Sequence, residues 1–473
     1  MLHNHISEIF LKNMGFLPTI GQKNLIAHLS AFISDSKNHA TFLIKGFAGT
    51  GKTTMVNALV KTLAEFSIDA VLMAPTGRAA KVLSSYTGKD AFTIHKKIYR
   101  QRSSNEGFGV FAVNFNPAKN TFFIVDEASM LSNSQGDFSP FGSGKLLTDL
   151  IDFVFSGQNC KLILIGDTAQ LPPVGLDISP ALDIRELRYC GLDVSEAFLK
   201  DIVRQSEDSG ILMNATAIRN IIDSGKVDIP ILHIDGFDDV VPVTGNDLLE
   251  FINDSYDKNG VENTIVITRS NKRANQFNQG IRNKILWRES ELESGDLLMV
   301  VKNNYHWMKD NREINFIANG DIIRVARVKK IYEQFGLRFA DITAVFADYN
   351  DLEADMKIIL DTLTSEGPSL TADENKKLYY SVLEEYADAK NKKELNEKIK
   401  SDPHFNALQV KYAYAITGHK AQGGQWDTVF LDQGYFKPEM NNTEFLRWLY
   451  TGFTRPTKKL FLVNFNACFF DSQ

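Results

Sequence analysis

The chain has 473 residues, of which 44% are hydrophobic and 23% charged, a composition typical of a water-soluble globular protein with more than one domain. Its net charge of −6 excludes an overall basic nucleic-acid-binding protein, so any such surface has to be a local basic strip. No apolar run approaches the roughly 18 residues of a membrane span. The three cysteines are odd in number and lack zinc-ligand spacing, which indicates a reducing compartment. We therefore expect a cytoplasmic protein without a membrane segment.

The strongest local signal is the stretch GFAGTGKTT at residues 46–54. It follows the apolar run 41–45, which is typical of a buried strand, and precedes residues 55–66, where apolar side chains recur at helical spacing. Glycines let the backbone N–H groups of such a loop surround a phosphate, and the helix N-terminus adds partial positive charge. Lys52 suits the β- and γ-phosphates and the Thr53 hydroxyl suits Mg²⁺. The stretch predicts a nucleotide-binding P-loop.

A pair of carboxylates follows a second apolar run. Residues 121–125 predict a strand, and Asp126 and Glu127 come directly after it. At the carboxyl end of a P-loop sheet, Asp126 can hold Mg²⁺ while Glu127 polarises a water for attack on the γ-phosphate. We expect this pair to be functional.

Other polar groups suit the same chemistry but carry less weight alone. Gln22 can hydrogen-bond both edges of an adenine, or it is an ordinary polar residue in a first helical turn. Gln170, in the turn 166–174 after the strand 161–165, can sense a γ-phosphate. The guanidinium fork of Arg204 can bind phosphate oxygens.

The second half of the chain repeats an α/β pattern without a P-loop. Residues 225–245 predict a linker, and a second sheet begins at 263 and resumes near 413. Strand patterns near 295–301 and 319–325 predict a small barrel, and residues 351–400 predict a charged helical arm.

Residues 108–115 have the composition of a small β-hairpin, which is either a surface excursion with its own core or a working wedge. The final segment is dense in polar and basic groups. It contains TGHKAQG at residues 417–423 and YTGFTRP at residues 450–456.

Taken in order, the blocks GFAGTGKTT, APTGRAAK, TIH, VDEASM, GDTAQLPPVG, RQ, TGHKAQG and YTGFTRP resemble a superfamily 1 helicase of the 5′-to-3′ branch, which includes RecD-like and Dda-type DNA helicases. The resemblance implies an α/β fold with two RecA-like P-loop NTPase domains. The first spans residues 1–225, with a hairpin insertion at 96–120. The second spans 246–290 and 406–473, and an SH3-like β-barrel with a helical arm is inserted at 291–405.

The resemblance also implies roles for individual residues. The catalytic groups would be Lys52, Glu127, Gln170, Arg204 and Arg455, the two arginines acting as arginine fingers. The metal ligands would be Thr53 and Asp126. Besides Lys52 and Thr53, nucleotide contacts would come from Gln22, Gly46, Ala48, Gly49, Thr50, Gly51, Thr54 and Gly423. The single-strand path would be lined by Pro75, Thr76, Arg78, Thr93, His95, Thr417, His419, Lys420 and Gln422, and the hairpin would separate the strands.

The expected activity is ATP- and Mg²⁺-dependent unwinding of forked DNA by a monomer that moves 5′-to-3′ on single-stranded DNA, in contact with a single-strand-binding protein. Two other readings stay open: a translocase that strips proteins without unwinding, and an ATP-gated binding protein without useful turnover. RNA as the substrate also stays open, because backbone-directed binding carries no sequence signal for the sugar.

Overall fold

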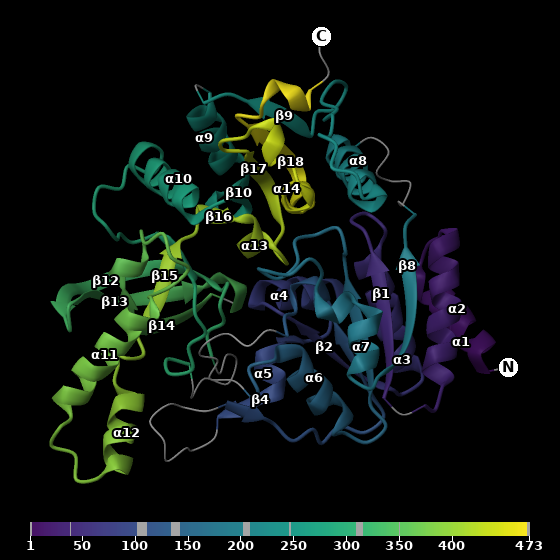
Figure 1. Cartoon of the computed structure of the whole chain (residues 1–473), viewed down its shortest axis with the longest axis horizontal. Helices are drawn as coiled ribbons and strands as arrows, with labels where there is room; N and C mark the ends of the chain where they lie inside the picture. Colours follow the sequence, from purple (N-terminus) through teal and green to yellow (C-terminus); the bar gives the residue numbers. More distant parts are fainter. Residues whose placement is uncertain are drawn as a thin grey trace.

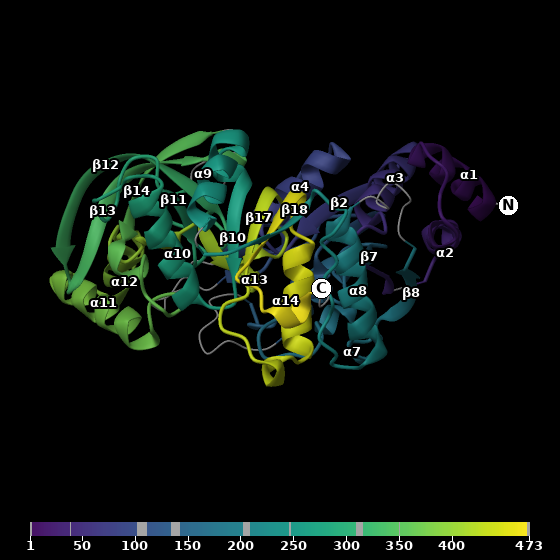
Figure 2. The same cartoon turned by 90° about the horizontal axis from the view of Figure 1, so that it is seen from above.

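The computed structural model describes residues 2–37, 39–101, 111–133, 142–201, 209–245, 247–308, 316–349 and 351–470. Two parallel sheets and a closed β-barrel make up the molecule (Figure 1). The barrel lies at one end and the first sheet at the other, with the second sheet between them (Figure 2). This confirms the predicted fold class. Within the described ranges, no helix is both long and apolar enough to cross a membrane.

The first sheet is parallel throughout and has the strand order β3-β2-β6-β7-β1-β8. All residues of β6 and β7 are buried, which explains their continuous apolar sequences, because helices cover both faces of the sheet. The strands are β1 (Ala40–Gly46), β2 (Asp69–Ala74), β3 (Ala91–Thr93), β6 (Thr121–Val125), β7 (Lys161–Gly166) and β8 (Asp193–Leu199).

Helices pack on both faces of this sheet and form a separate core on each. One core takes side chains from α1 (Leu2–Met14), α2 (Ile20–Ser34), α3 (Lys52–Glu65) and α4 (Gly77–Thr87). The other takes side chains from α5 (Ile94–Ile98), α6 (Leu146–Phe155) and α7 (Ile184–Tyr189). Because β6, β7 and β1 are neighbours, the turns after their carboxyl ends meet at one edge.

The second sheet has the order β16-β10-β17-β18-β9, again all parallel. Its strands are β9 (Val240–Val243), β10 (Thr264–Thr268), β16 (Ala415–Thr417), β17 (Trp426–Asp432) and β18 (Pro456–Val463). Its helices are α9 (Leu248–Asn259), α10 (Asn271–Lys284), α13 (Gly418–Ala421) and α14 (Thr443–Phe453).

Two predicted boundaries of this region differ from the structure. β9 lies in the segment predicted as a linker. The sequence did not reveal this strand because its short apolar run pairs with β18, which is far away in the sequence. α8 (Gly210–Ser224) was predicted to belong to the first domain, yet Ala215 and Ile218 are buried in the core shared with the second sheet, where α8 packs on α14. The second sheet therefore includes β9, which lies before the predicted domain start at residue 246.

The inserted barrel closes in the order β11-β12-β13-β14-β15. Its strands are β11 (Leu297–Val300), β12 (Ile322–Gln334), β13 (Leu337–Phe346), β14 (Leu352–Ile359) and β15 (Leu408–Tyr412). The predicted insertion boundary at residue 405 is therefore wrong, because β15 pairs with both β11 and β14. The predicted helical arm also starts too early, since residues 352–359 form β14 with the second half of the strand buried in the barrel.

The arm consists of α11 (Ala372–Glu385) and α12 (Lys392–Ser401). A capping box starts α11: Thr371 accepts from the Glu374 N–H, and the Glu374 carboxylate accepts from the Thr371 N–H. Leu378 and Val382 of α11 pack with Phe339 of β13, so the arm is fixed to the barrel by an apolar seam.

A two-stranded hairpin projects from the first domain. β4 (Tyr99–Gln101) pairs antiparallel with β5 (Phe111–Val113). The predicted hairpin at 108–115 is thus shifted, because its first strand comes from residues 99–101; residues 102–110 lie outside the described residues. The Phe111 ring contacts Tyr305, which in turn stacks on Phe316 beside the barrel. The hairpin therefore touches the inserted domain.

A buried ion cluster joins α10 to the start of β11. Asp296 is fully buried and accepts from the Arg282 guanidinium through both of its carboxylate oxygens, at 2.9 and 3.0 Å. We expect Asp296→Ala to lower the free energy of unfolding by about 3–5 kcal/mol, because it leaves the buried Arg282 charge without its counterion. Chemical denaturation measures this, with Asp254→Ala, which breaks an exposed pair with Lys258, as a control expected to cost about 0.5 kcal/mol or less. Equal effects of the two substitutions would contradict the prediction.

Candidate nucleotide and nucleic-acid site

The P-loop joins β1 to α3 in the geometry that the sequence predicts. Gly49 and Gly51 have φ of 74° and 82°, the left-handed region that favours glycine, and they turn the chain into the α3 N-terminus. The Lys52 Nζ donates to the carbonyls of Gly46 at 2.7 Å and Phe47 at 2.9 Å. Loop, helix N-terminus and lysine converge, as a phosphate site requires.

Gln22 stabilises the P-loop through a hydrogen bond to its backbone. It is buried, and its amide donates to the Thr50 carbonyl at 3.1 Å. Its side-chain oxygen accepts from the Thr19 N–H at the start of α2. Both ends of the amide therefore have partners inside the chain, so reading an adenine, which stays a prediction, would require Gln22 to exchange one of them.

The carboxylate pair lies at the end of β6, two strands from the P-loop. Burial, and then the neighbouring Glu127 carboxylate, raise the pKa of Asp126 to about 6. Glu127 has a φ of 53°, which is uncommon for a residue with a side chain and is typical of strained functional sites. Asp126 is half-buried, and its carboxylate and the hydroxyl of the P-loop residue Thr53 are oxygen ligands of the kind that Mg²⁺ prefers.

The turn after β7 brings in a residue that the sequence analysis did not single out. Asp167 is buried, and one of its oxygens lies 3.8 Å from the Lys52 Nζ. Its other oxygen accepts from the Ala169 N–H at 3.0 Å. Gln170 is also buried, and in the part of the chain that the structure describes its side-chain oxygen has no hydrogen-bond partner. The turn thus places the Asp167 carboxylate beside the P-loop lysine.

The second domain reaches this turn through α14. Thr451 accepts a hydrogen bond from the Leu171 N–H at 3.1 Å, and the Tyr450 hydroxyl donates to the Asp167 carboxylate at 2.7 Å. The Ala48 N–H of the P-loop donates to the same hydroxyl at 2.8 Å. Tyr450 was also missed, although it stands inside the YTGFTRP block, because a tyrosine in an apolar helical pattern reads as core.

Arg455 follows α14 and is buried within the second domain. Its guanidinium donates to the carbonyls of Thr451 and Gly424, both at 3.2 Å, and to the Thr454 hydroxyl at 2.9 Å. Arg204, the other predicted finger, lies outside the described residues.

An open cavity of about 210 Å³ separates the P-loop from the segment after α14. Its walls include Ala48 and Gly49 on one side and Thr454, Pro456 and Lys458 on the other. The neighbours of Arg455 in sequence therefore face the P-loop across a cleft, as a cross-domain nucleotide site requires.

The predicted single-strand residues on the first domain sit at helix starts. Thr76, which follows Pro75, caps α4, and Thr93 caps α5. Arg78 stacks over the Trp426 ring at 4.1 Å and donates to the Gln425 carbonyl, so it joins the two domains. Burial lowers the pKa of His95 to about 4, which keeps this side chain neutral.

The residues predicted on the second domain gather around α13. Thr417 precedes the helix, and burial lowers the pKa of His419. Gln422 is buried and donates to the Leu171 carbonyl, which makes it a contact with the turn after β7. Gly423 lies against α4, where a Cβ would meet Ala79 at 2.8 Å, and its contact with nucleotide stays a prediction.

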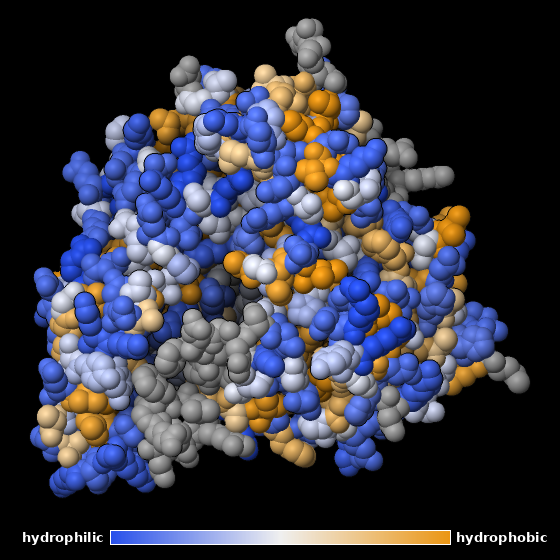
Figure 3. All heavy atoms as spheres, viewed as in Figure 1, coloured by the Kyte–Doolittle hydropathy of each residue, from blue (hydrophilic) through white to orange (hydrophobic). Residues whose placement is uncertain are grey.

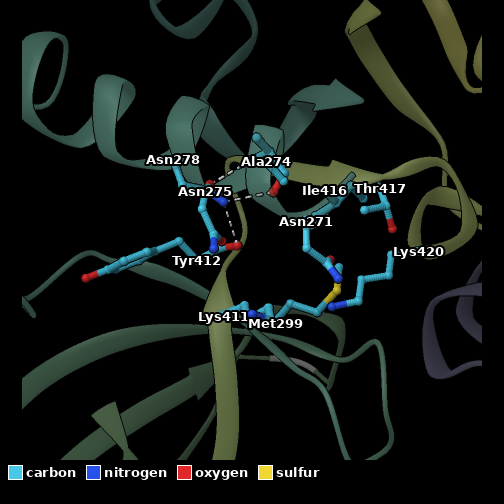
Figure 4. A pocket seen from close by; sticks show the side chains of 11 residues that line it. Asn271, Ala274, Asn275, Asn278, Met299, Lys411, Tyr412, Ile416, Thr417 and Lys420 are labelled. Carbon is cyan, nitrogen blue, oxygen red and sulfur yellow. Dashed lines mark hydrogen bonds between the residues drawn. The ribbon is translucent and has the colours of Figure 1, made fainter. Parts of the chain in front are cut away.

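Lys420 lies in a cleft between α10, α13 and the barrel (Figure 4). Its side chain extends from α13 toward Met299, and Lys411 of β15 lines the same cleft. Burial lowers the pKa of each lysine to about 8, and the charge of Lys411 adds to the effect on Lys420. Asn271 and Asn275 supply amides to this cleft. Cations and amides in a groove suit a phosphate backbone.

These pKa values predict a pH dependence of oligonucleotide binding. A backbone phosphate binds the charged lysine, so affinity should fall as pH rises through 8, by about tenfold between pH 7 and 9 for one such lysine. Anisotropy of a labelled oligonucleotide at constant ionic strength measures it. Lys420→Arg, which stays protonated, should flatten the profile. A profile that is unchanged in this variant would exclude Lys420 from the interface.

Fold and site together define a P-loop NTPase whose second domain contacts the nucleotide loops. The family model described as an AAA domain matches residues 20–224, and that described as a UvrD-like helicase C-terminal domain matches residues 412–463. The ATP-dependent RecD2 DNA helicase of Deinococcus radiodurans is 30% identical over 161 residues, 33% of this chain and 20% of that protein. The ATP-dependent DNA helicase dda of Enterobacteria phage T4 is 26% identical over 453 residues, 87% of this chain and 92% of that protein.

Among solved structures, a Pif1 helicase from Bacteroides in complex with ADP-AlF3 and ssDNA aligns over 97% of this chain and 95% of its own, with 16% identity and a TM-score of 0.48. The chain is thus similar to RecD-type and Dda-type helicases, which confirms the resemblance that the motifs indicated. The match to RecD2 spans only a fifth of that protein, whereas the match to the phage helicase is nearly end to end.

Proposed function

We propose that the chain is an ATP-dependent DNA helicase that moves 5′-to-3′ along single-stranded DNA and unwinds duplex ahead of it. The observation that supports this most is the seam at α14, where the second domain touches both the P-loop and the turn after β7. The relatives named as DNA helicases support the same class. A seam of this kind lets a change at the phosphates alter the relation between two domains.

The residues present fit ATP with Mg²⁺. Gly49 and Gly51 hold the loop open for phosphates, Lys52 supplies a cation, and Thr53 with Asp126 would hold the metal. Bound Mg²⁺ would neutralise charge on the phosphate oxygens. Glu127 would accept a proton from the attacking water, and Gln170 would hydrogen-bond near the γ-phosphate.

The polynucleotide would lie across α13 and the cleft that contains Lys420 and Asn271. Hydrophilic residues cover most of the face drawn in Figure 3. Since the net charge is −6, backbone binding would depend on a few local cations and would weaken steeply with salt. The hairpin β4–β5 would act as the wedge, with the Phe111–Tyr305 contact holding it against the barrel region.

An unwinding assay with 5′-tailed and 3′-tailed duplexes of DNA and of RNA tests the proposal. The expected result is ATP-dependent separation of the 5′-tailed DNA duplex alone. Separation of the 3′-tailed duplex would contradict the proposed 5′-to-3′ direction, and preferential separation of the RNA duplex would contradict DNA as the substrate. ATP turnover with displacement of a bound protein but without strand separation would favour the stripping translocase.

A further inference from the structure

Tyr450 occupies a position that the proposed chemistry does not use. It is 1% exposed and belongs to α14 of the second domain, yet both hydrogen bonds of its hydroxyl go to the first domain. It accepts from the Ala48 N–H and donates to Asp167. Burial, and then the Asp167 carboxylate, raise the pKa of Tyr450 well above its usual range, so the hydroxyl keeps its proton and can do both.

One partner of this hydroxyl, the Ala48 N–H, is a donor that a bound phosphate would also engage, and the other, Asp167, lies beside Lys52, which a phosphate would attract. A P-loop N–H donates fully to one acceptor, so a phosphate oxygen and the Tyr450 hydroxyl compete for Ala48. Lys52 lies between Asp167 and the loop carbonyls, so a phosphate that attracts Lys52 draws it from Asp167. Tyr450 is therefore hydrogen-bonded to both places where phosphate binding changes the local charge.

A neighbouring residue in the same turn of α14, Trp448, reaches the predicted polynucleotide segment. The Trp448 ring packs against Gly418, where a Cβ would lie 2.6 Å from its Cδ1, and its indole N–H donates to the Thr268 carbonyl at 3.3 Å. Gly418 begins α13, which contains Lys420. One turn of α14 thus connects the P-loop with the helix that carries the predicted DNA contacts.

The P-loop also packs tightly against α8, so a small displacement of the loop would displace this helix. A Cβ at Gly49 would meet Leu212 of α8 at 2.7 Å, and the Phe47 ring lies 4.4 Å from the Arg219 guanidinium. Since α8 packs on α14, movement of the loop changes a continuous contact surface. Packing alone does not distinguish a phosphate from another group of the same size. The Tyr450 hydroxyl does, because it loses the Ala48 N–H when a phosphate oxygen accepts from that N–H instead.

We infer that Tyr450 is a positioning residue that couples phosphate occupancy of the P-loop to polynucleotide binding at α13, through competition for the Ala48 N–H and through its bond to Asp167. This rests on the proposed function, since it names how that site communicates. By linkage, the factor by which an oligonucleotide changes nucleotide affinity equals the factor by which nucleotide changes oligonucleotide affinity. We expect the size of this factor to depend on the Tyr450 hydroxyl.

The test measures ADP binding with Mg²⁺ by calorimetry, with and without a saturating thymidine oligonucleotide, in the wild type and in Tyr450→Phe. Phenylalanine keeps the ring and removes only the hydroxyl. We expect the oligonucleotide to change ADP affinity at least fivefold in the wild type and less than twofold in the variant. Adenosine, which lacks phosphates, should bind equally to both proteins.

Tyr386→Phe is the matched control, because Tyr386 makes the same kind of bond to Asp402 at 3.0 Å in the helical arm. It should keep the wild-type factor, and thermal melts confirm that each variant is folded. The inference would be overturned if the oligonucleotide changed ADP affinity in Tyr450→Phe by the same factor as in the wild type. It would also be overturned if the substitution changed adenosine affinity as much as ADP affinity, or if the oligonucleotide left the ADP affinity of the wild type unchanged. The proposed function fails separately, through absence of ATP-dependent unwinding in the wild type.

Discussion

Lys52→Ala should abolish ATP hydrolysis, with turnover falling to the background of the assay. The Lys52 ammonium is held at the mouth of the P-loop by the carbonyls of Gly46 and Phe47 and lies 3.8 Å from Asp167. Alanine removes the one P-loop cation that can balance charge on the β- and γ-phosphates. Phosphate release at saturating ATP measures the loss, and oligonucleotide binding without nucleotide should stay within about threefold of wild type, because Lys420 lies in a separate cleft.

Glu127→Gln is the matched control for this experiment. The amide keeps the size of the side chain but cannot accept the proton of the attacking water. This variant should bind ATP and lose turnover, which separates chemistry from binding. Normal hydrolysis in Glu127→Gln would remove Glu127 from its proposed role. Joint loss of hydrolysis and oligonucleotide binding in Lys52→Ala would indicate misfolding or another site.

Arg455→Ala should lower turnover by roughly 10³-fold or more if Arg455 acts as an arginine finger. The segment that follows α14 faces Ala48 and Gly49 across the nucleotide cleft. The guanidinium is held by the carbonyls of Thr451 and Gly424, so reaching a phosphate requires it to exchange at least one of these partners. Steady-state hydrolysis with saturating oligonucleotide is the measurement.

Two further variants separate a catalytic from a structural effect. Arg455→Lys keeps the charge but loses the fork, so it should recover only a small part of the rate. Lys458→Ala removes a nearby cation that lines the cleft and pairs with Asp427 at 3.0 Å, and it should leave turnover within about threefold of wild type. A near-normal rate in Arg455→Ala would refute the cross-domain role.

The sequence predicted where the P-loop and its neighbouring turns lie in the fold, because these signals are local; the roles of their side chains stay predictions. The P-loop, the Asp126–Glu127 pair and the turn after β7 each follow their own strand, and a parallel sheet brings such turns to one edge. The same logic failed for elements whose partners are distant. Residues 352–359 are charged and were predicted as helix, but they pair with β13 and close the barrel with β15.

Two predicted DNA contacts, which stay predictions, have partners that the motifs did not indicate. Arg78 and Gln422 were assigned by motif, and the structure gives them partners on the opposite domain, at Gln425 and Leu171. A motif indicates which residue types lie near a site, whereas the hydrogen-bond partners of these residues depend on how the two domains pack against each other.

By itself, the sequence determined the class of fold, the phosphate-binding loop and its carboxylates, since strand, turn and helix signals lie within a few residues of one another. Only the tertiary structure decided which side chain of the second domain touches that loop. Ala48 and Tyr450 are 402 positions apart, and nothing in the local pattern distinguishes a tyrosine that packs from one that also bonds across a seam. The physical reason is that such a contact depends on the packing of whole domains, which no short stretch of chain encodes.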